Sequence, residues 1–218
     1  MTSKKKLIIV GAGGLGRIVH DVLSKDADFT REYVLAGFLD NRPDVDLPAE
    51  LKGSILGCPL SYIPQPDEVF IPAIGDPAWR KKLLAPLISQ DAVFYSYTGQ
   101  ASVAARTRIG RGVFLTPGAV ISTDCEIGDY CYVDTYVIAG HDTTVGNYCT
   151  IGAMSFLAGG VKVEDGVAIH PRATIAKDVR LGAGCTVGIG SVVVKNVQPN
   201  VTVFGNPARI IAMHSESE

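Results

Sequence analysis

The chain has 218 residues, of which 47% are hydrophobic, and its formal net charge is −2 with a pI of about 6.1. This length suits two domains of modest size. The sequence has no basic stripe typical of nucleic-acid binding and no run near the roughly 20 apolar residues that span a membrane. We therefore expect neither nucleic acid nor a membrane as a partner.

The amino-terminal part, residues 1–97, alternates strand and helix patterns. Residues 7–10 predict a short buried strand, and 15–24 predict an amphipathic helix. Further strands are expected at 34–39 and 69–74, and Pro77 suits the first turn of a helix that runs to about Ile88. This alternation predicts a small Rossmann-like α/β domain with a parallel sheet.

Glycines follow the first predicted strand directly. Gly11, Gly13 and Gly16 match the pattern G-x-G-x-x-G, and Asp40 ends the second strand at about the distance expected of a dinucleotide site. Such a loop brings backbone N–H groups close to phosphate at a helix start, and an acidic residue such as Asp40 can bind a sugar hydroxyl. A domain of about 97 residues is too short for both Rossmann halves, so we expect it to hold one nucleotide. The alternatives are an NAD-dependent enzyme, or glycines that serve only tight strand-to-helix packing.

A strict period of six runs through the second part of the chain. Every sixth residue from Val103 to Val193 is aliphatic, 16 positions without a miss. Two residues before each of them the side chain is nearly always small, and residues two apart in a strand point to the same face. Each repeat therefore sends one small and one larger apolar side chain inward, as a flat-sided solenoid requires.

Three such repeats make a coil of 18 residues, so residues 101–196 predict about five coils of a three-sided prism. The alternative, a β-sandwich, has no reason to keep this period through its loops. Glycine often follows the aliphatic position directly, where we expect the chain to turn a corner with positive φ. These glycines are Gly110, Gly128, Gly140, Gly146, Gly152, Gly182 and Gly188.

Four of the five cysteines occupy the small inward positions of the repeat: Cys125, Cys131, Cys149 and Cys185. We interpret them as thiols that fill the core, not as disulfides or metal ligands. We therefore expect no metal site and a reducing, cytoplasmic location.

His141 is the candidate reactive side chain of the repeat surface. It lies two residues past Ala139, in Gly140-His141-Asp142, and should face outward. A histidine there can accept a proton, and Asp142 or a carboxylate of a neighbouring coil such as Asp124 can orient its ring. The alternative is an ordinary solvated histidine.

A second candidate site follows from the coil geometry. Ala153, Pro171 and Ile189 are 18 residues apart and should stack along one corner. Such a ladder suits a long, thin, partly apolar ligand such as a pantetheine arm, with Lys195 and Arg209 placed to meet its phosphates.

These motifs resemble those of the bacterial nucleotide-aminosugar N-acetyltransferases and the related sialic acid O-acetyltransferases, which are hexapeptide-repeat acyltransferases. The resemblance covers nearly the whole chain. It is carried by the glycine loop at 11–16, Phe38-Leu39-Asp40-Asn41, Ala73-Ile74-Gly75-Asp76 with Arg80-Lys81-Lys82-Leu83, Gly140-His141-Asp142 and Gly205-Asn206-Pro207-Ala208-Arg209.

The resemblance implies a nucleotide-sugar-binding domain at 1–97 followed by a left-handed parallel β-helix at 98–218. It also implies a homotrimer that transfers acetyl directly from acetyl-CoA to the amino group of a nucleotide-linked amino-deoxy sugar. In such an enzyme His141 is the general base and Asp142 the acid that assists it. The matching substrate positions are Gly13, Gly14, Leu15, Asp40, Asn41 and Gly75, and those of the acetyl-CoA groove are Thr150, Pro171 and Ile189, beside Lys195.

Three positions depart from the family pattern. The glycine loop usually carries histidine where this chain has Leu15, asparagine is common at Asp134, and Thr150 replaces a histidine of some members. Two other functions stay open. The same base acting on a hydroxyl would O-acetylate a sugar such as sialic acid, and a non-catalytic chain would use the prism only to trimerise a nucleotide-binding domain.

Overall fold

The structure, a computed structural model, describes residues 4–45, 47–51 and 54–214. The chain divides into two compact units, Met1–Tyr95 and Ser96–Glu218. Within the described residues, no helix is both long and apolar enough to cross a membrane.

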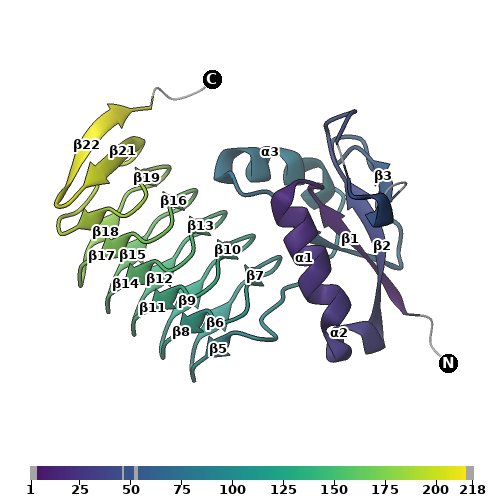
Figure 1. Ribbon diagram of the computed structural model, residues 1–218, viewed down its shortest axis with the longest axis horizontal. Coiled ribbons are helices and arrows are strands. Elements are labelled where there is room, and N and C mark those ends of the chain that lie inside the picture. The colour runs from purple at the N-terminus through teal and green to yellow at the C-terminus, as the bar shows by residue number, and fades with distance from the viewer. Residues whose placement is uncertain (1–3, 46, 52–53, 215–218) are drawn as a thin grey trace. The chain divides into compact units, whose positions relative to one another are not determined.

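The first unit is a four-stranded sheet with helices packed on it (Figure 1). In sheet order its strands are β3 (Ile55–Gly57), β2 (Tyr33–Leu39), β1 (Lys5–Val10) and β4 (Glu68–Pro72), and each neighbouring pair is parallel. The helices are α1 (Gly14–Lys25), α2 (Ala27–Glu32), the short 3-10 helix η1 (Ala49–Leu51) and α3 (Pro77–Ile88). The small parallel α/β unit expected from the sequence is confirmed.

In this unit, the elements that the sequence predicted are those with more than one buried apolar residue. The last four residues of β1, Leu7 to Val10, are fully buried, and α1 buries Val19 and Leu23. Three elements were not expected: α2, η1 and β3. Helix α2 is only six residues long and begins where the Asp26 carboxylate accepts hydrogen bonds from two backbone N–H groups. Strand β3 is a three-residue edge strand whose apolar side chains are partly exposed.

The second unit is a three-sided parallel β-helix (Figure 1). Its sides are built from 16 two-residue strands: β5 (Ser102–Val103), β6 (Arg108–Ile109), β7 (Phe114–Leu115), β8 (Val120–Ile121), β9 (Glu126–Ile127), β10 (Tyr132–Val133), β11 (Ile138–Ala139), β12 (Thr144–Val145), β13 (Thr150–Ile151), β14 (Phe156–Leu157), β15 (Lys162–Val163), β16 (Ala168–Ile169), β17 (Thr174–Ile175), β18 (Arg180–Leu181), β19 (Thr186–Val187) and β20 (Val192–Val193). Paired strands are 18 residues apart, as with Val133 and Ile151. The coil length predicted from the sequence is therefore confirmed.

The repeat residues fill the interior as expected. From Leu115 onward every aliphatic position is buried, and so is the small residue two before it. Val103, 37% exposed, and the half-buried Ile109 are exceptions because they belong to the first coil, which has no coil beneath it. At the other end an antiparallel hairpin, β21 (Val201–Gly205) and β22 (Ala208–Met213), continues one sheet past β19. The six-residue period did not predict this hairpin.

The corners differ from the sequence prediction. Positive φ occurs three residues after each aliphatic position from Val103 to Val187, at every sixth residue from Arg106 to Gly190, and most of these residues are not glycine. The glycines directly after the aliphatic positions serve close approach between coils instead. A Cβ at Gly128, for example, would lie 2.7 Å from the carbonyl carbon of Gly146 in the next coil. The expectation of positive φ at these glycines was therefore wrong.

We expect Leu157→Ala to lower the free energy of unfolding by about 2–5 kcal/mol, because it leaves a cavity in a close-packed interior. Lys162→Ala, on the exposed surface of the following strand, should change it by less than about 0.5 kcal/mol. Urea denaturation followed by circular dichroism measures both. Equal effects would show that the inward column is not the core of this unit.

Candidate active site

A cavity of about 450 Å³ lies at the carboxyl ends of β1, β2 and β4 in the first unit. Open parallel sheets bind ligands at this edge. The cavity is lined by the loops that follow these strands and by the start of α3. The structure brings together all six residues expected to hold a nucleotide sugar: Gly13, Gly14, Leu15, Asp40, Asn41 and Gly75.

The glycines of this loop fall into two groups. A Cβ at Gly16 would lie 2.0 Å from the carbonyl oxygen of Gly11, and a Cβ at Gly11 would lie 2.6 Å from that of Ala73. Packing alone therefore requires glycine at these two positions. A Cβ at Gly14 or Gly75 would have no atom beyond its chain neighbours within 4 Å. Packing does not explain these two glycines, which leave the cavity wall bare.

Asp40 is a buried carboxylate held by the loop around it. Its side chain is 4% exposed, and Oδ2 accepts a hydrogen bond from the backbone N–H of Ala12 at 2.8 Å. Arg42 donates to both oxygens, from Nε at 2.8 Å and Nη2 at 2.8 Å, and its backbone N–H donates to Oδ1. Burial by itself would raise the pKa of Asp40. The hydrogen bonds from Arg42 and Ala12 outweigh it and lower this pKa to about 2.

Three further residues shape this cavity, and the sequence did not single them out as site residues: Arg42, Trp79 and Arg80. Arg80 is fully buried and donates to the carbonyl oxygens of Ile74 and Gly75, which fixes the loop after β4. A helical spacing that the sequence does show, Arg80 with Leu83, Leu84 and Leu87, indicates that this arginine faces inward. Trp79 is half-exposed on the cavity wall.

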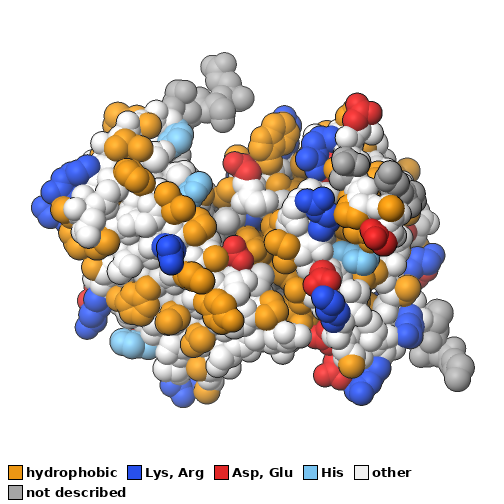
Figure 2. Space-filling model, viewed as in Figure 1, with side chains coloured by type: hydrophobic (Ala, Val, Ile, Leu, Met, Phe, Trp, Pro, Cys, Tyr) orange, Lys and Arg blue, Asp and Glu red, His pale blue; other side chains and the backbone are white. Residues whose placement is uncertain are grey.

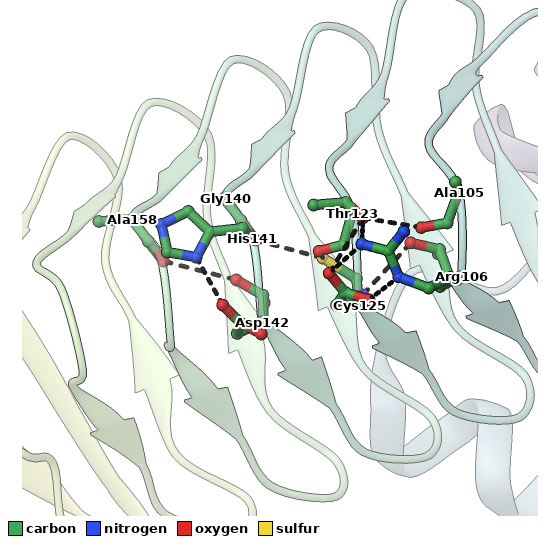
Figure 3. Close-up of polar contacts among 11 residues, drawn as sticks. Ala105, Arg106, Thr123, Cys125, Gly140, His141, Asp142 and Ala158 are labelled. Atoms are coloured by element: carbon green, nitrogen blue, oxygen red, sulfur yellow. Dashed lines mark hydrogen bonds and ion pairs between the residues drawn. The ribbon is translucent and has the colours of Figure 1, made fainter.

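The side chains of His141 and Asp142 are hydrogen-bonded to each other on the surface of the β-helix (Figure 3). The imidazole Nδ1 lies 2.6 Å from Oδ2 of Asp142, and the two side chains are 59% and 65% exposed. Asp142 has a φ of 59°. In an extended strand adjacent side chains point to opposite faces. The left-handed conformation turns the carboxylate back toward the ring.

The coils on either side leave this pair unobstructed. In the following coil, a Cβ at Gly159 would lie 2.6 Å from Nε2 of His141, so the ring rests against a bare backbone. Asp124 lies in the preceding coil, and Arg106, one coil further back, binds it through Nε at 2.5 Å and Nη2 at 2.7 Å (Figure 3). These hydrogen bonds lower the pKa of Asp124. The carboxylate partner of the ring is therefore Asp142, not Asp124.

The residues expected at an acetyl-CoA groove lie apart from His141 on the same column. Ala153, Pro171 and Ile189 stack at one corner, because backbone N–H groups there bond to carbonyls one coil away. His141 lies at another corner, across the side formed by β11 and its neighbours. Thr150 is half-buried on β13. Lys195 and Arg209 line a shared cavity of about 500 Å³.

The cysteines are core thiols. All five are free, and the four in the repeat are buried. Burial raises the pKa of Cys185 to about 12, which keeps this thiol protonated. In the part of the chain that the structure describes, no group of three or more His, Cys, Asp or Glu side chains is placed to hold a metal ion.

Two family models match the chain. The PglD N-terminal domain model matches residues 6–87, and the bacterial transferase hexapeptide model (six repeats) matches residues 124–159. Among curated proteins, the acyl-[acyl-carrier-protein]–UDP-N-acetylglucosamine O-acyltransferase of Pseudomonas aeruginosa is 32% identical over 133 residues, 59% of this chain and 52% of that protein. The serine acetyltransferase of Escherichia coli is 30% identical over 118 residues, which are 53% of this chain and 40% of that protein. The chain spans about half the length of these curated relatives.

Solved structures are similar over nearly the whole chain. PerB from Caulobacter crescentus, in complex with CoA and GDP-perosamine, is 28% identical with a TM-score of 0.81, over 96% of this chain and 98% of that one. WeeI from Acinetobacter baumannii is 26% identical with a TM-score of 0.79, over 94% and 99%. The acetyltransferase domain of PglB from Neisseria gonorrhoeae, 24% identical with a TM-score of 0.84 over 95% and 100%, shows the same fold.

The two family models and the shared fold define a class of protein, the hexapeptide-repeat transferases with a PglD-type amino-terminal domain. The chain is similar to this class over nearly its whole length, and the class is the one that its motifs resemble.

The glycine loop makes a prediction about stability. Gly16→Ala should lower the free energy of unfolding by about 1–3 kcal/mol or more, because its Cβ meets rigid backbone. Gly14→Ala, in the first turn of the same helix, should leave it unchanged or raise it by up to about 1 kcal/mol. Urea denaturation followed by the fluorescence of Trp79, the single tryptophan, measures both. A destabilised Gly14→Ala would mean that packing requires this glycine too.

The lowered pKa of Asp40 predicts a pH dependence. Hydrogen bonds to a charged group contribute about 1.5–3 kcal/mol, so Asp40→Asn should destabilise the first unit by that amount near pH 6. A depressed carboxyl pKa stabilises above the unfolded value of about 4 and loses its effect as pH falls toward about 2. The gap between wild type and Asp40→Asn, measured by urea titrations followed by Trp79 fluorescence, should therefore close between pH 4 and pH 2. A gap that does not depend on pH would contradict this assignment.

Proposed function

We propose that the protein is an acetyl-CoA-dependent N-acetyltransferase that acts on the amino group of a nucleotide-linked amino-deoxy sugar. The observation that carries this proposal is the exposed His141–Asp142 pair on a hexapeptide column. The first unit of the same chain contains a cavity of about 450 Å³ that is lined in part by a glycine loop. PerB, which shares the fold over nearly its whole length, supports the choice of ligands because it is solved with CoA and GDP-perosamine.

The geometry of the pair suits a general base. With Nδ1–H donating to Asp142, the lone pair of His141 lies on Nε2, beside the bare backbone of Gly159. The amine nitrogen of the sugar attacks the thioester carbonyl carbon, and its proton passes to Nε2. The C–S bond then breaks and the CoA sulfur leaves as a thiol with that proton. General-base help of this kind contributes about a hundredfold to ten-thousandfold.

The second ligand, acetyl-CoA, fits the corner of stacked small and apolar residues. We assign Pro171, Ile189 and Thr150 to its groove, and Lys195 with Arg209 to its phosphates. Because this corner and His141 lie on different edges of one prism, one chain does not by itself join them. A homotrimer, in which one subunit's His141 corner faces its neighbour's groove, brings the two together.

The side of the column between these two corners supports such an assembly. Its outward residues Val120, Ile138 and Phe156 are exposed and apolar, as are Tyr136 and Met154 at its edge. Hydrophobic side chains also gather on the face of the β-helix that Figure 2 shows. The side that contains β6 and β9, by contrast, carries ion pairs such as Arg108–Glu126. Exposed apolar patches of this kind mark protein interfaces. The free thiols of the core support a reducing compartment such as the cytoplasm.

Matched sugars test the reaction. Nucleotide sugars that differ only in a 4-amino or 4-hydroxy group are incubated with acetyl-CoA, and the free CoA thiol is measured. N-acetylation predicts thiol release with the amino sugars alone. Release with the hydroxy sugars or with sialic acid would establish an O-acetyltransferase instead. Nucleotide binding without any release would support a non-catalytic scaffold.

We expect His141→Asn to reduce turnover at least a hundredfold, because asparagine cannot accept the proton. The Kd of acetyl-CoA should change little. The matched control is His214→Asn, the same change at an exposed histidine of the C-terminal hairpin region, which should keep wild-type turnover. Thiol release gives turnover and calorimetry gives the Kd. Near-normal turnover of His141→Asn would remove this residue from the mechanism.

A further inference from the structure

We propose that Arg42 binds the phosphates of the nucleotide and that Asp40 holds Arg42 in place for that purpose. This inference rests on the proposed function and assigns a residue that the family motifs do not single out. Its starting point is the side-on pair between the Arg42 guanidinium and Asp40, which lies on the wall of the cavity in the first unit.

Asp40 has no acceptor left for a ligand in this arrangement. Each carboxylate oxygen already accepts two hydrogen bonds, Oδ1 from the backbone N–H and Nε of Arg42, and Oδ2 from Ala12 N–H and Nη2 of Arg42. A carboxylate offers about four such positions. The side chain is also 4% exposed. Asp40 therefore acts through Arg42 and is a positioning residue.

Arg42 is the part of this pair that faces solvent. Its side chain is 56% exposed, although its Nε and Nη2 are both bound to Asp40. A guanidinium has five N–H donors. Asp40 takes two of them, and the other three have no partner within the described part of the chain. A rigid guanidinium with three open donors suits an oxyanion such as phosphate.

The surroundings of Arg42 also favour an anion. Its Nη2 would lie 3.4 Å from a Cβ at Gly13, so the guanidinium stands over the start of α1. That helix has a glycine at its N-cap, no side-chain cap and no acidic residue in its first turn, which leaves its N-terminal partial charge without a side chain to balance it. Among the described residues that line the cavity, Arg42 is the one cation. A diphosphate bound between the start of α1 and the Arg42 guanidinium would contact both of these positive groups.

The test compares ligands that differ in phosphate alone. UDP, dTDP and GDP, and the three matching nucleosides, are titrated by calorimetry into wild type, Arg42→Gln and Arg31→Gln. Arg31 is the matched control, because it is an exposed arginine bound to an aspartate of the same unit but lies outside the cavity. We expect Arg42→Gln to weaken the best-bound diphosphate at least tenfold and to leave the nucleoside unchanged. Arg31→Gln should change neither.

Further arms separate the possible failures. Asp40→Asn should weaken diphosphate binding in the same direction. The fluorescence of Trp79, on α3 of the first unit, reports that this unit folds in each variant. Acetyl-CoA, which we assign to the second unit, should bind every variant as it binds wild type. Wild-type diphosphate affinity in Arg42→Gln would overturn this inference and leave the proposed acetyl transfer standing. Equal losses for nucleoside and diphosphate would also overturn it. If wild type binds no diphosphate but binds sialic acid, both this inference and the nucleotide-sugar substrate fall.

Discussion

The backbone ladder between coils 18 residues apart is the constraint on which the second unit depends. Each side of the column has only two strand residues per coil. One aliphatic side chain and the small residue two before it must therefore fill the interior on that side. Any change of register would move an outward residue such as Lys162 inward and Val163 outward. The period of six thus fixes which residues form the corners, and with them the place of His141.

The first unit depends on a different constraint, the close approach of backbone to backbone after β1. The missing side chains at Gly11 and Gly16 let the chain pass from strand to helix beside the loop after β4. This brings the ends of three strands around one cavity. The same geometry fixes the positions of Asp40 and Arg42, because Ala12 N–H at the turn donates to Asp40 and Asp40 binds Arg42. The packing of the glycine loop and its electrostatics are therefore coupled.

Much of this architecture is predictable from the sequence because its signals are periodic or local. The repeat predicted the coil length, and the glycine loop with Asp40 predicted the residues that line one cavity. What was missed depends on tertiary context. The pairing of β3 at a sheet edge, the antiparallel β21–β22 hairpin and the clamp between Asp40 and Arg42 have no period. Positive φ was assigned to the wrong glycines because both close approach and left-handed backbone favour glycine, and only the fold separates them.

The corners explain why a histidine and the carboxylate that it contacts can be adjacent in sequence on a β fold. Side chains at neighbouring strand positions diverge, but a residue with positive φ at each corner brings them onto the same side. Thr123 and Asp124 show the same effect, with a hydrogen bond of 3.1 Å between their side chains. Fifteen corners repeat this conformation from Arg106 to Gly190, and only one carries a histidine followed by an acid. The fold supplies the pairing geometry everywhere, so the chemistry depends on which two residues occupy a corner. In the proposed function, the chemistry of the column therefore depends on residues 141 and 142 and needs no distortion of the repeat.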